Sequence, residues 1–208
     1  MTKILLTVVT LLFVAPEWTF DTDPVGGLPS GWQARGGSPA GIYRIETDPD
    51  GNRFLAARSR GSDVQLGIAF TAKPAEFPIM SWRWRVWELP RKADERAIKT
   101  MDSAAAVYAA FGSRLFPRVL KYVWSTSVPT GASFRHPSSD RMAIIVIASG
   151  VNELGQWHNV SRNIVDDYRS VFGGDPGNLI TLGIKTDSDS TGTSSRADYD
   201  DLRLERRR

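Results

Sequence analysis

A short acidic segment near the C-terminal end carries side chains suited to binding a metal ion. Asp187 and Asp189 stand at alternate positions, Thr191 and Gly192 follow, and Asp198 lies eleven positions after Asp187. A calcium loop has this pattern, because a hard cation takes several oxygens from one short, sharply turning segment. The match is partial, since threonine stands at the fifth position and aspartate replaces the usual final glutamate. The segment therefore predicts a structural Ca²⁺ site at Asp187, Asp189, Thr191 and Asp198, or alternatively a plain polar turn.

Aromatic side chains close to arginines indicate a surface that binds sugars. Trp87 follows Arg83 and Arg85 in the segment SWRWRVW, and Tyr122 and Trp124 lie together in KYVWS. Flat rings pack against the apolar faces of pyranoses, while neighbouring polar groups bind the hydroxyls. We expect these five residues to line a carbohydrate-binding surface, with packing in the core as the alternative for each ring.

Arg162 is a further candidate for ligand binding. It stands four positions before Asp166 in a segment with helical periodicity. A salt bridge at this spacing on a solvated helix face is the first interpretation. Contact between the guanidinium and a ligand is the second.

The chain contains none of the common catalytic motifs. The serine elbow G-x-S-x-G, the zinc motif H-E-x-x-H, the P-loop and the dinucleotide motif G-x-G-x-x-G are missing from the sequence. No catalytic residue is therefore predicted. Two chemistries stay open as alternatives. One is a carboxylate pair for glycoside hydrolysis, whose spacing in space does not show in a sequence. The other is a lyase-like base and neutraliser drawn from Tyr122, Arg135, His136, His158 and Arg162.

Composition removes several other classes of protein. The 208 residues include no cysteine, which excludes disulfides and zinc–thiolate sites. Only His136 and His158 are available to a histidine metal centre or a hydrolase triad. The formal charge of +3 comes from the arginines at 206–208, and without them and Lys3 it falls to −1. The charge thus gives no reason to expect a nucleic-acid partner.

The N-terminal end has the features of an export signal. Residues 4–15 form a twelve-residue apolar run, ILLTVVTLLFVA, behind the single cation Lys3. A membrane span needs about 20 apolar residues, whereas this length suits the core of a signal peptide. Residues 1–15 are predicted to be a signal peptide or N-terminal anchor, so the mature protein is periplasmic or secreted and has no membrane span. A first core strand is the alternative, because the run is rich in β-branched residues.

The elements that would position the candidate residues are mostly strands. Short apolar or alternating segments recur between clusters of Gly, Pro, Asn and Asp, a pattern typical of an all-β domain. The predicted strands are residues 41–47, 53–58, 64–70, 79–87, 104–111, 120–125, 143–148, 156–160, 179–186 and 199–204. A hairpin turn is expected at 48–52, because its Pro and Gly suit turn geometry. Residues 16–208 are predicted to form a single domain, since no repeat or linker divides them.

Two segments show a clear periodicity. In residues 79–87, alternation separates a core face from an outer face that carries Arg83, Arg85 and Trp87. The side chains on the core face are Met80, Trp82, Trp84 and Val86. Residues 162–172 have an apolar stripe at helical spacing and end at Gly173 and Gly174. The predicted fold is an all-β, two-sheet β-sandwich of jelly-roll type, with one short helix packed on an edge or end.

Four segments together resemble one bacterial family, domain of unknown function 3047. They are SWRWRV, KYVWSTSVPTG, SGVNELGQWHNVSRNIVDDYRSVFGGDP and KTDSDSTGTSSRADYDDLRL, in this order from about residue 79 to residue 204. The resemblance implies an exported bacterial protein and carries over no established activity. The opening WTFDTDPVGGLPSGW and the closing strand are also similar to the ends of galactose-binding-like carbohydrate-binding modules, which implies a jelly roll that often holds structural calcium.

These patterns lead to one expected function and two alternatives. We expect an exported, non-catalytic protein that binds carbohydrate or another cell-envelope ligand. The first alternative is a polysaccharide lyase or glycoside hydrolase on the same scaffold. The second is a purely structural component of the envelope.

Overall fold

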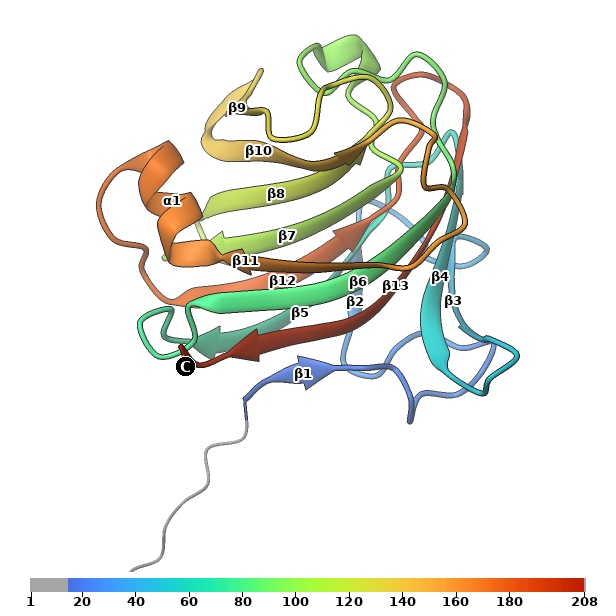
Figure 1. Cartoon of the computed structure of the whole chain (residues 1–208), viewed down its shortest axis with the longest axis horizontal. Coiled ribbons are helices and arrows are strands. Elements are labelled where there is room, and N and C mark those ends of the chain that lie inside the picture. The colour runs from blue at the N-terminus through green and yellow to red at the C-terminus, as the bar shows by residue number, and fades with distance from the viewer. Residues whose placement is uncertain (1–14, 208) are drawn as a thin grey trace, which may run out of the picture.

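The computed structural model describes residues 15–207, which fold into two β-sheets packed face to face with one α-helix at one end (Figure 1). This arrangement confirms the predicted two-sheet β-sandwich. The predicted leader at residues 1–15 lies outside the described residues except for Ala15. No helix in the described range is both long enough and apolar enough to cross a bilayer.

The first sheet, here called sheet A, contains six strands. Their order is β11 (His158–Asn163), β6 (Ile79–Glu88), β13 (Ser194–Glu205), β4 (Arg53–Arg60) and β3 (Tyr43–Thr47), with β1 (Glu17–Trp18) also paired to β13. The predicted turn at 48–52 joins β3 to β4, and the Gly51 N–H donates to the Asp48 carbonyl at 2.9 Å.

The second sheet, sheet B, contains seven strands. Their order is β2 (Gln33–Arg35), β5 (Gln65–Ala72), β12 (Leu179–Lys185), β7 (Ala105–Phe111), β8 (Arg118–Ser125), β10 (Ser139–Ser149) and β9 (Ser133–His136). All neighbours are antiparallel except β8 and β10, which run parallel. A 3₁₀ turn at Ile98–Thr100 lies within the long connection from β6 to β7.

The core lies between the inner faces of the two sheets. On β6 the predicted alternation is confirmed, because Met80, Trp82, Trp84 and Val86 are at most 2% exposed. From sheet B, the ring of Tyr122 lies 5.3 Å from that of Trp82, and the ring of Trp124 lies 6.3 Å from that of Trp84. Tryptophans of sheet A and aromatic residues of β8 therefore hold the sheets together.

All ten predicted strands are present, with boundaries that differ by a few residues. Strands β1, β2 and β9 were not predicted, because two to four residues are too few to show a period. The predicted helix is α1 (Ile164–Phe172). It begins two residues later than expected, because Arg162 and Asn163 still pair with β6. Asn163 then caps the helix by accepting from the Val165 and Asp166 N–H groups.

Candidate functional site

The outer face of β6 brings three predicted ligand-binding residues together. Arg83, Arg85 and Trp87 point away from the core, as their alternation with the buried tryptophans requires. Three residues from other segments join them, and we call the whole set the arginine–aromatic face. Its members are Phe54, Arg83, Arg85, Trp87, Trp157 and Arg196. The sequence did not indicate Phe54, Trp157 or Arg196. Phe54 and Arg196 reach this face because β4 pairs with β13 and β13 with β6, and Trp157 reaches it because it directly precedes β11, which also pairs with β6.

Arg85 is the organising side chain of this face. Its guanidinium carbon lies 4.4 Å from the ring centre of Trp157, 4.8 Å from that of Trp87 and 5.1 Å from that of Phe54. It also pairs with Asp198 at 2.9 Å and with Asp48 at 3.0 Å. Arg85 is only 9% exposed. Its charge is therefore already compensated within the protein, and its role here is to hold the rings in place.

Trp87 is the member of the face that is open to solvent. It is 40% exposed, while its indole N–H donates to Asp198 at 2.6 Å. The guanidinium of Arg196 lies 4.9 Å from its ring centre. Gly155 leaves room beside the ring, since a Cβ there would lie 3.2 Å from Cζ3. The ring is thus fixed in orientation before any ligand arrives.

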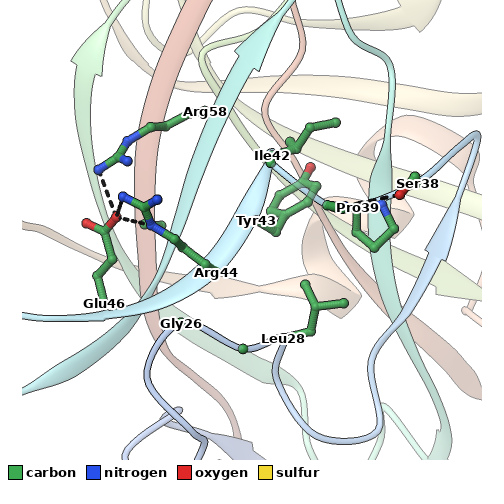
Figure 2. Close-up of a pocket in the computed structure, with 13 residues that line it drawn as sticks. Gly26, Leu28, Ser38, Pro39, Ile42, Tyr43, Arg44, Glu46 and Arg58 are labelled. Atoms are coloured by element: carbon green, nitrogen blue, oxygen red, sulfur yellow. Dashed lines mark hydrogen bonds and ion pairs between the residues drawn. The ribbon is translucent and has the colours of Figure 1, made fainter.

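A polar groove adjoins Trp87 across strands β3, β4 and β13. It consists of two hollows of about 500 and 800 Å³ that share Ser38, Ala40, Gly41, Ile42 and Arg58. In the first hollow, Arg44 and Arg58 both contact Glu46, at 2.5 and 2.8 Å (Figure 2). The second hollow extends to Glu88 and Arg196, which are the neighbours of Trp87. We call these two hollows together the β3–β4 groove.

The charge of the β3–β4 groove is mostly positive. Four arginines line it, whereas its only acidic residues are two glutamates. These residues are Arg44, Arg58, Arg60, Arg196, Glu46 and Glu88. Glu46 accepts from two of the arginines, and Glu88 accepts from the Ser194 hydroxyl. Arg196 has no ion pair among the described residues, so its charge is available to a ligand.

Buried carboxylates support the outer face of sheet A. Burial raises the pKa of Asp198, although hydrogen bonds from Trp87 and Arg85 act in the opposite direction. Burial likewise raises the pKa of Asp200 to about 6, against hydrogen bonds from Asn52 and Arg83. Both carboxyls lie on β13, whose outer side chains face those of β6.

Two of the predicted aromatic residues are not on any surface. Tyr122 and Trp124 are 0% and 1% exposed, so the expectation that they line a sugar-binding surface is wrong. Both belong to the inner face of β8, and the Trp124 indole N–H donates to the Gly150 carbonyl at 3.1 Å. The alternative of core packing is correct for these two rings.

Arg162 pairs with a different aspartate from the one expected. Its guanidinium contacts both carboxylate oxygens of Asp167, at 2.5 and 3.0 Å, and the Tyr122 hydroxyl donates to the same carboxylate at 2.9 Å. The predicted pair with Asp166 is wrong, because Arg162 lies in β11 rather than in the helix. Arg162 also borders a hollow of about 500 Å³ between β10, β11 and α1.

The residues of the lyase-like alternative are dispersed. Tyr122 and Arg162 meet through Asp167, but neither histidine is hydrogen-bonded to them. His158 lies edge-on against Trp124, with ring centres 4.7 Å apart. His136 and Arg135 lie on β9 in sheet B. The arrangement therefore does not assemble the base and neutraliser that such chemistry requires.

The acidic segment forms a cluster that differs from the predicted calcium set. Carboxylate oxygens of Asp63, Asp187 and Asp189 lie within 4.8 Å of one another and could hold a metal ion. Asp198 is wrong as a member, because β13 carries it to the outer face of sheet A, where it binds Arg85. Thr191 is also engaged elsewhere, since its hydroxyl donates to Asp102 at 2.5 Å.

A lysine already lies within this acidic cluster. The Lys185 ammonium contacts Asp63 and lies 2.7 Å from Asp187. It therefore places one positive charge where a cation would otherwise be needed. Calcium at Asp187 and Asp189 stays a prediction.

Comparison with known proteins places the sequence in a family. The family described as "Protein of unknown function (DUF3047)" matches residues 30–203. No curated protein matches the chain in sequence.

Several solved structures are similar in fold. The CBM22-2 xylan-binding domain of Xyn10C from Paenibacillus barcinonensis is 12% identical, with a TM-score of 0.45 over 92% of this chain and 98% of that chain. A cleaved adhesin domain of Lys-gingipain from Porphyromonas gingivalis is 10% identical, with a TM-score of 0.43 over 94% and 99%. The xylan-binding module CBM15 is 12% identical, with a TM-score of 0.40 over 94% and 100%.

Proposed function

The chain belongs to the DUF3047 family, and we propose that it is a non-catalytic module that binds polysaccharide in the β3–β4 groove with Trp87 as the stacking ring. The observation that carries this proposal is the indole of Trp87, which is exposed, is held by a hydrogen bond to Asp198 and lies beside a polar groove. If one sugar ring stacks on Trp87, the adjacent sugar units of the polysaccharide lie within reach of Arg196 and Glu88.

The chemistry of the groove supports a sugar as the ligand. A pyranose offers an apolar face to an aromatic ring and hydroxyls to charged and polar groups. Trp87 supplies the ring, and Arg58 and Arg196 supply donors along the groove. Because Asp198 and Arg85 already hold the ring in place, little conformational entropy is lost when the ligand binds.

The excess of arginine favours an acidic polysaccharide over a neutral one. Four arginines and two glutamates line the groove, which leaves two positive charges in excess. Uronate carboxylates form charge-assisted hydrogen bonds with guanidinium groups. We therefore infer a uronate-containing polysaccharide, such as one found in a cell envelope, as the preferred ligand.

The absence of catalysis is part of the proposal. A glycosidase needs one carboxyl poised as an acid and a second as a base or nucleophile. Glu46 is held by two arginines and Glu88 by Ser194, so neither resembles a poised acid. Export to the periplasm or the exterior fits this function and rests on the leader predicted at residues 1–15.

Affinity electrophoresis tests the binding site. The chain is run through gels that contain polygalacturonate, alginate, xylan or mixed-linkage glucan, and retardation by the uronate polymers is expected. Trp87→Ala should weaken binding about 10- to 100-fold, because stacking on an indole is worth about 1.5–3 kcal/mol. Phe116→Ala is the matched control, since this ring is 65% exposed and lies in the connection between β7 and β8 of sheet B, away from the outer face of sheet A.

Two results would contradict the proposal. The first is no retardation by any polymer, and the second is an equal loss of binding in the Trp87 and Phe116 variants. Incubation with each polymer, followed by assays for reducing ends and for unsaturated products, addresses catalysis. Product formation that scales with protein concentration would favour the enzyme alternative.

A further inference from the structure

A second cavity lies on the outer face of sheet B, the sheet that does not carry Trp87. It has a volume of about 260 Å³, which corresponds to roughly nine water molecules. Four strands of sheet B contribute Lys185 from β12, Tyr108 from β7, Lys121 from β8 and His136 from β9. Nothing in the β3–β4 groove contributes to it.

Lys121 is the unusual residue in this cavity. It is 3% exposed, yet among residues 15–207 its ammonium has neither an ion pair nor a hydrogen-bond acceptor. Its neighbour is the ring of Tyr108, whose centre lies 5.7 Å away. Lys185, in contrast, is neutralised by Asp63 and Asp187. A charge withdrawn from bulk water without a counter-ion is costly, and because Lys121 lines the cavity, an anion bound there would compensate it.

The ammonium of Lys121 cannot avoid this cost by losing its proton. Burial and the charge of Lys185 lower the pKa of Lys121, whereas Tyr108, Asp187 and Glu95 raise it, and the net direction is upward. Lys121 is therefore charged at neutral pH. Glu95 is itself buried and accepts from the Ser103 and Ser125 hydroxyls rather than from Lys121.

Two further donors line the same cavity. His136 accepts from the Ser138 N–H through Nδ1, so its neutral ring carries its hydrogen on Nε2. Burial lowers the pKa of His136, and Lys121 and Lys185 lower it further, which keeps the ring neutral. The Tyr108 hydroxyl has no hydrogen-bond partner among the described side chains and backbone groups.

From this arrangement we propose that the cavity binds a small organic carboxylate, with the ammonium of Lys121 as its counter-ion and Tyr108 and His136 as hydrogen-bond donors. The charged residues that line the cavity are Arg35, Lys121, Lys185, Asp63 and Asp187, so its net charge is +1, which favours a singly charged anion over a doubly charged phosphate. Met101 and Met142 line the same cavity and suit a ligand with an apolar body.

Thermal unfolding with benzoate and benzamide tests the proposal. The two molecules share a shape, and only benzoate carries a charge. At constant ionic strength, benzoate at ten times its Kd should raise the Tm of the full chain by about 3–6 °C, and benzamide should leave it unchanged. Inorganic phosphate should act more weakly than benzoate.

Variants connect the effect to the cavity. Lys121→Met should abolish the response to benzoate while keeping the aliphatic packing. Lys73→Met is the matched control and should respond like the wild type, because this lysine side chain is 70% exposed. Tyr108→Phe, which removes a single hydroxyl, should raise the Kd for benzoate severalfold. This variant tests the cavity if Lys121→Met does not fold.

Some outcomes would overturn the proposal. The first is a Tm of the wild type that benzoate does not change, and the second is an equal rise of the Tm with benzamide. The third is an undiminished response to benzoate in Lys121→Met, or in Tyr108→Phe if Lys121→Met does not fold. Trp87→Ala should keep the benzoate response, so a failure of polysaccharide binding in the groove is distinguishable from a failure here.

Discussion

Asp200 is a buried carboxyl on the outer face of sheet A. It accepts from Asn52 Nδ2 at 2.9 Å and from the Arg83 guanidinium at 2.5 Å, and its side chain is 1% exposed. Because burial raises its pKa to about 6, the folded chain binds a proton at this carboxyl more readily than the unfolded chain does.

The raised pKa of Asp200 predicts a pH dependence of stability. Its contribution is fully present below about pH 4 and is lost as the pH rises to about 6. Asp200→Asn removes this titration while keeping an oxygen for Asn52 and Arg83. The free energy of unfolding of the wild type, relative to that of the variant, should fall by about 2–3 kcal/mol between pH 4 and pH 7. Urea unfolding across this pH range measures both free energies. If they change in parallel with pH in the wild type and in Asp200→Asn, the titration of Asp200 does not contribute to stability.

At the scale of elements, helix α1 closes one end of the sandwich. Tyr168 packs against Phe111 of β7, with ring centres 5.2 Å apart, and the helix ends at Gly173, whose φ is 70°. Its start depends on Asn163, which follows directly from β11 and accepts from two backbone N–H groups. Strand and helix are thus joined without a loop.

Removal of the Asn163 cap should loosen this end of the molecule. Asn163→Ala leaves two N–H groups at the start of α1 without their acceptor and should cost about 1 kcal/mol of stability. Asn163→Ser, which retains a capping oxygen, should be close to the wild type. Chemical denaturation measures both variants, and equal losses would show that the cap is not the cause.

At the scale of the whole molecule, the two sheets depend on one shared core. Trp84 of sheet A is 0% exposed and packs against Trp82 and Trp124, with ring centres 5.4 and 6.3 Å apart. Its indole N–H is buried without a hydrogen-bond partner. The contribution of Trp84 is therefore packing rather than hydrogen bonding.

Substitutions of Trp84 should separate these two contributions. Trp84→Ala should destabilise the fold by about 3–5 kcal/mol, because it leaves a cavity between the sheets. Trp84→Phe should cost clearly less, since it keeps a ring and removes a polar group that has no partner. Both sheets should unfold together, so fluorescence and circular dichroism should give the same urea midpoint. Separate midpoints would show that each sheet has its own stability.

The sequence alone determined the local elements and the faces of strands that alternate cleanly. The turn at 48–52, the helix near 164–172 and the two faces of β6 were all predictable, because each depends on residues within a few positions of one another. Trp87, Arg83 and Arg85 were placed on an outer face for this reason. The two-sheet fold followed from the rhythm of short strands.

Only the tertiary structure decided which side chains meet. Tyr122 and Trp124 could not be assigned to the core from β8, because Lys121 and Val123 on the other face are also buried and the alternation is hidden. Asp198 lies close to Asp187 in the sequence, but Asp198 is on β13 of sheet A and Asp187 is in the connection after β12, whereas Asp63 joins Asp187 from a distant segment. Spacing along the chain sets local geometry, and pairing between distant strands sets the contacts from which a site is built.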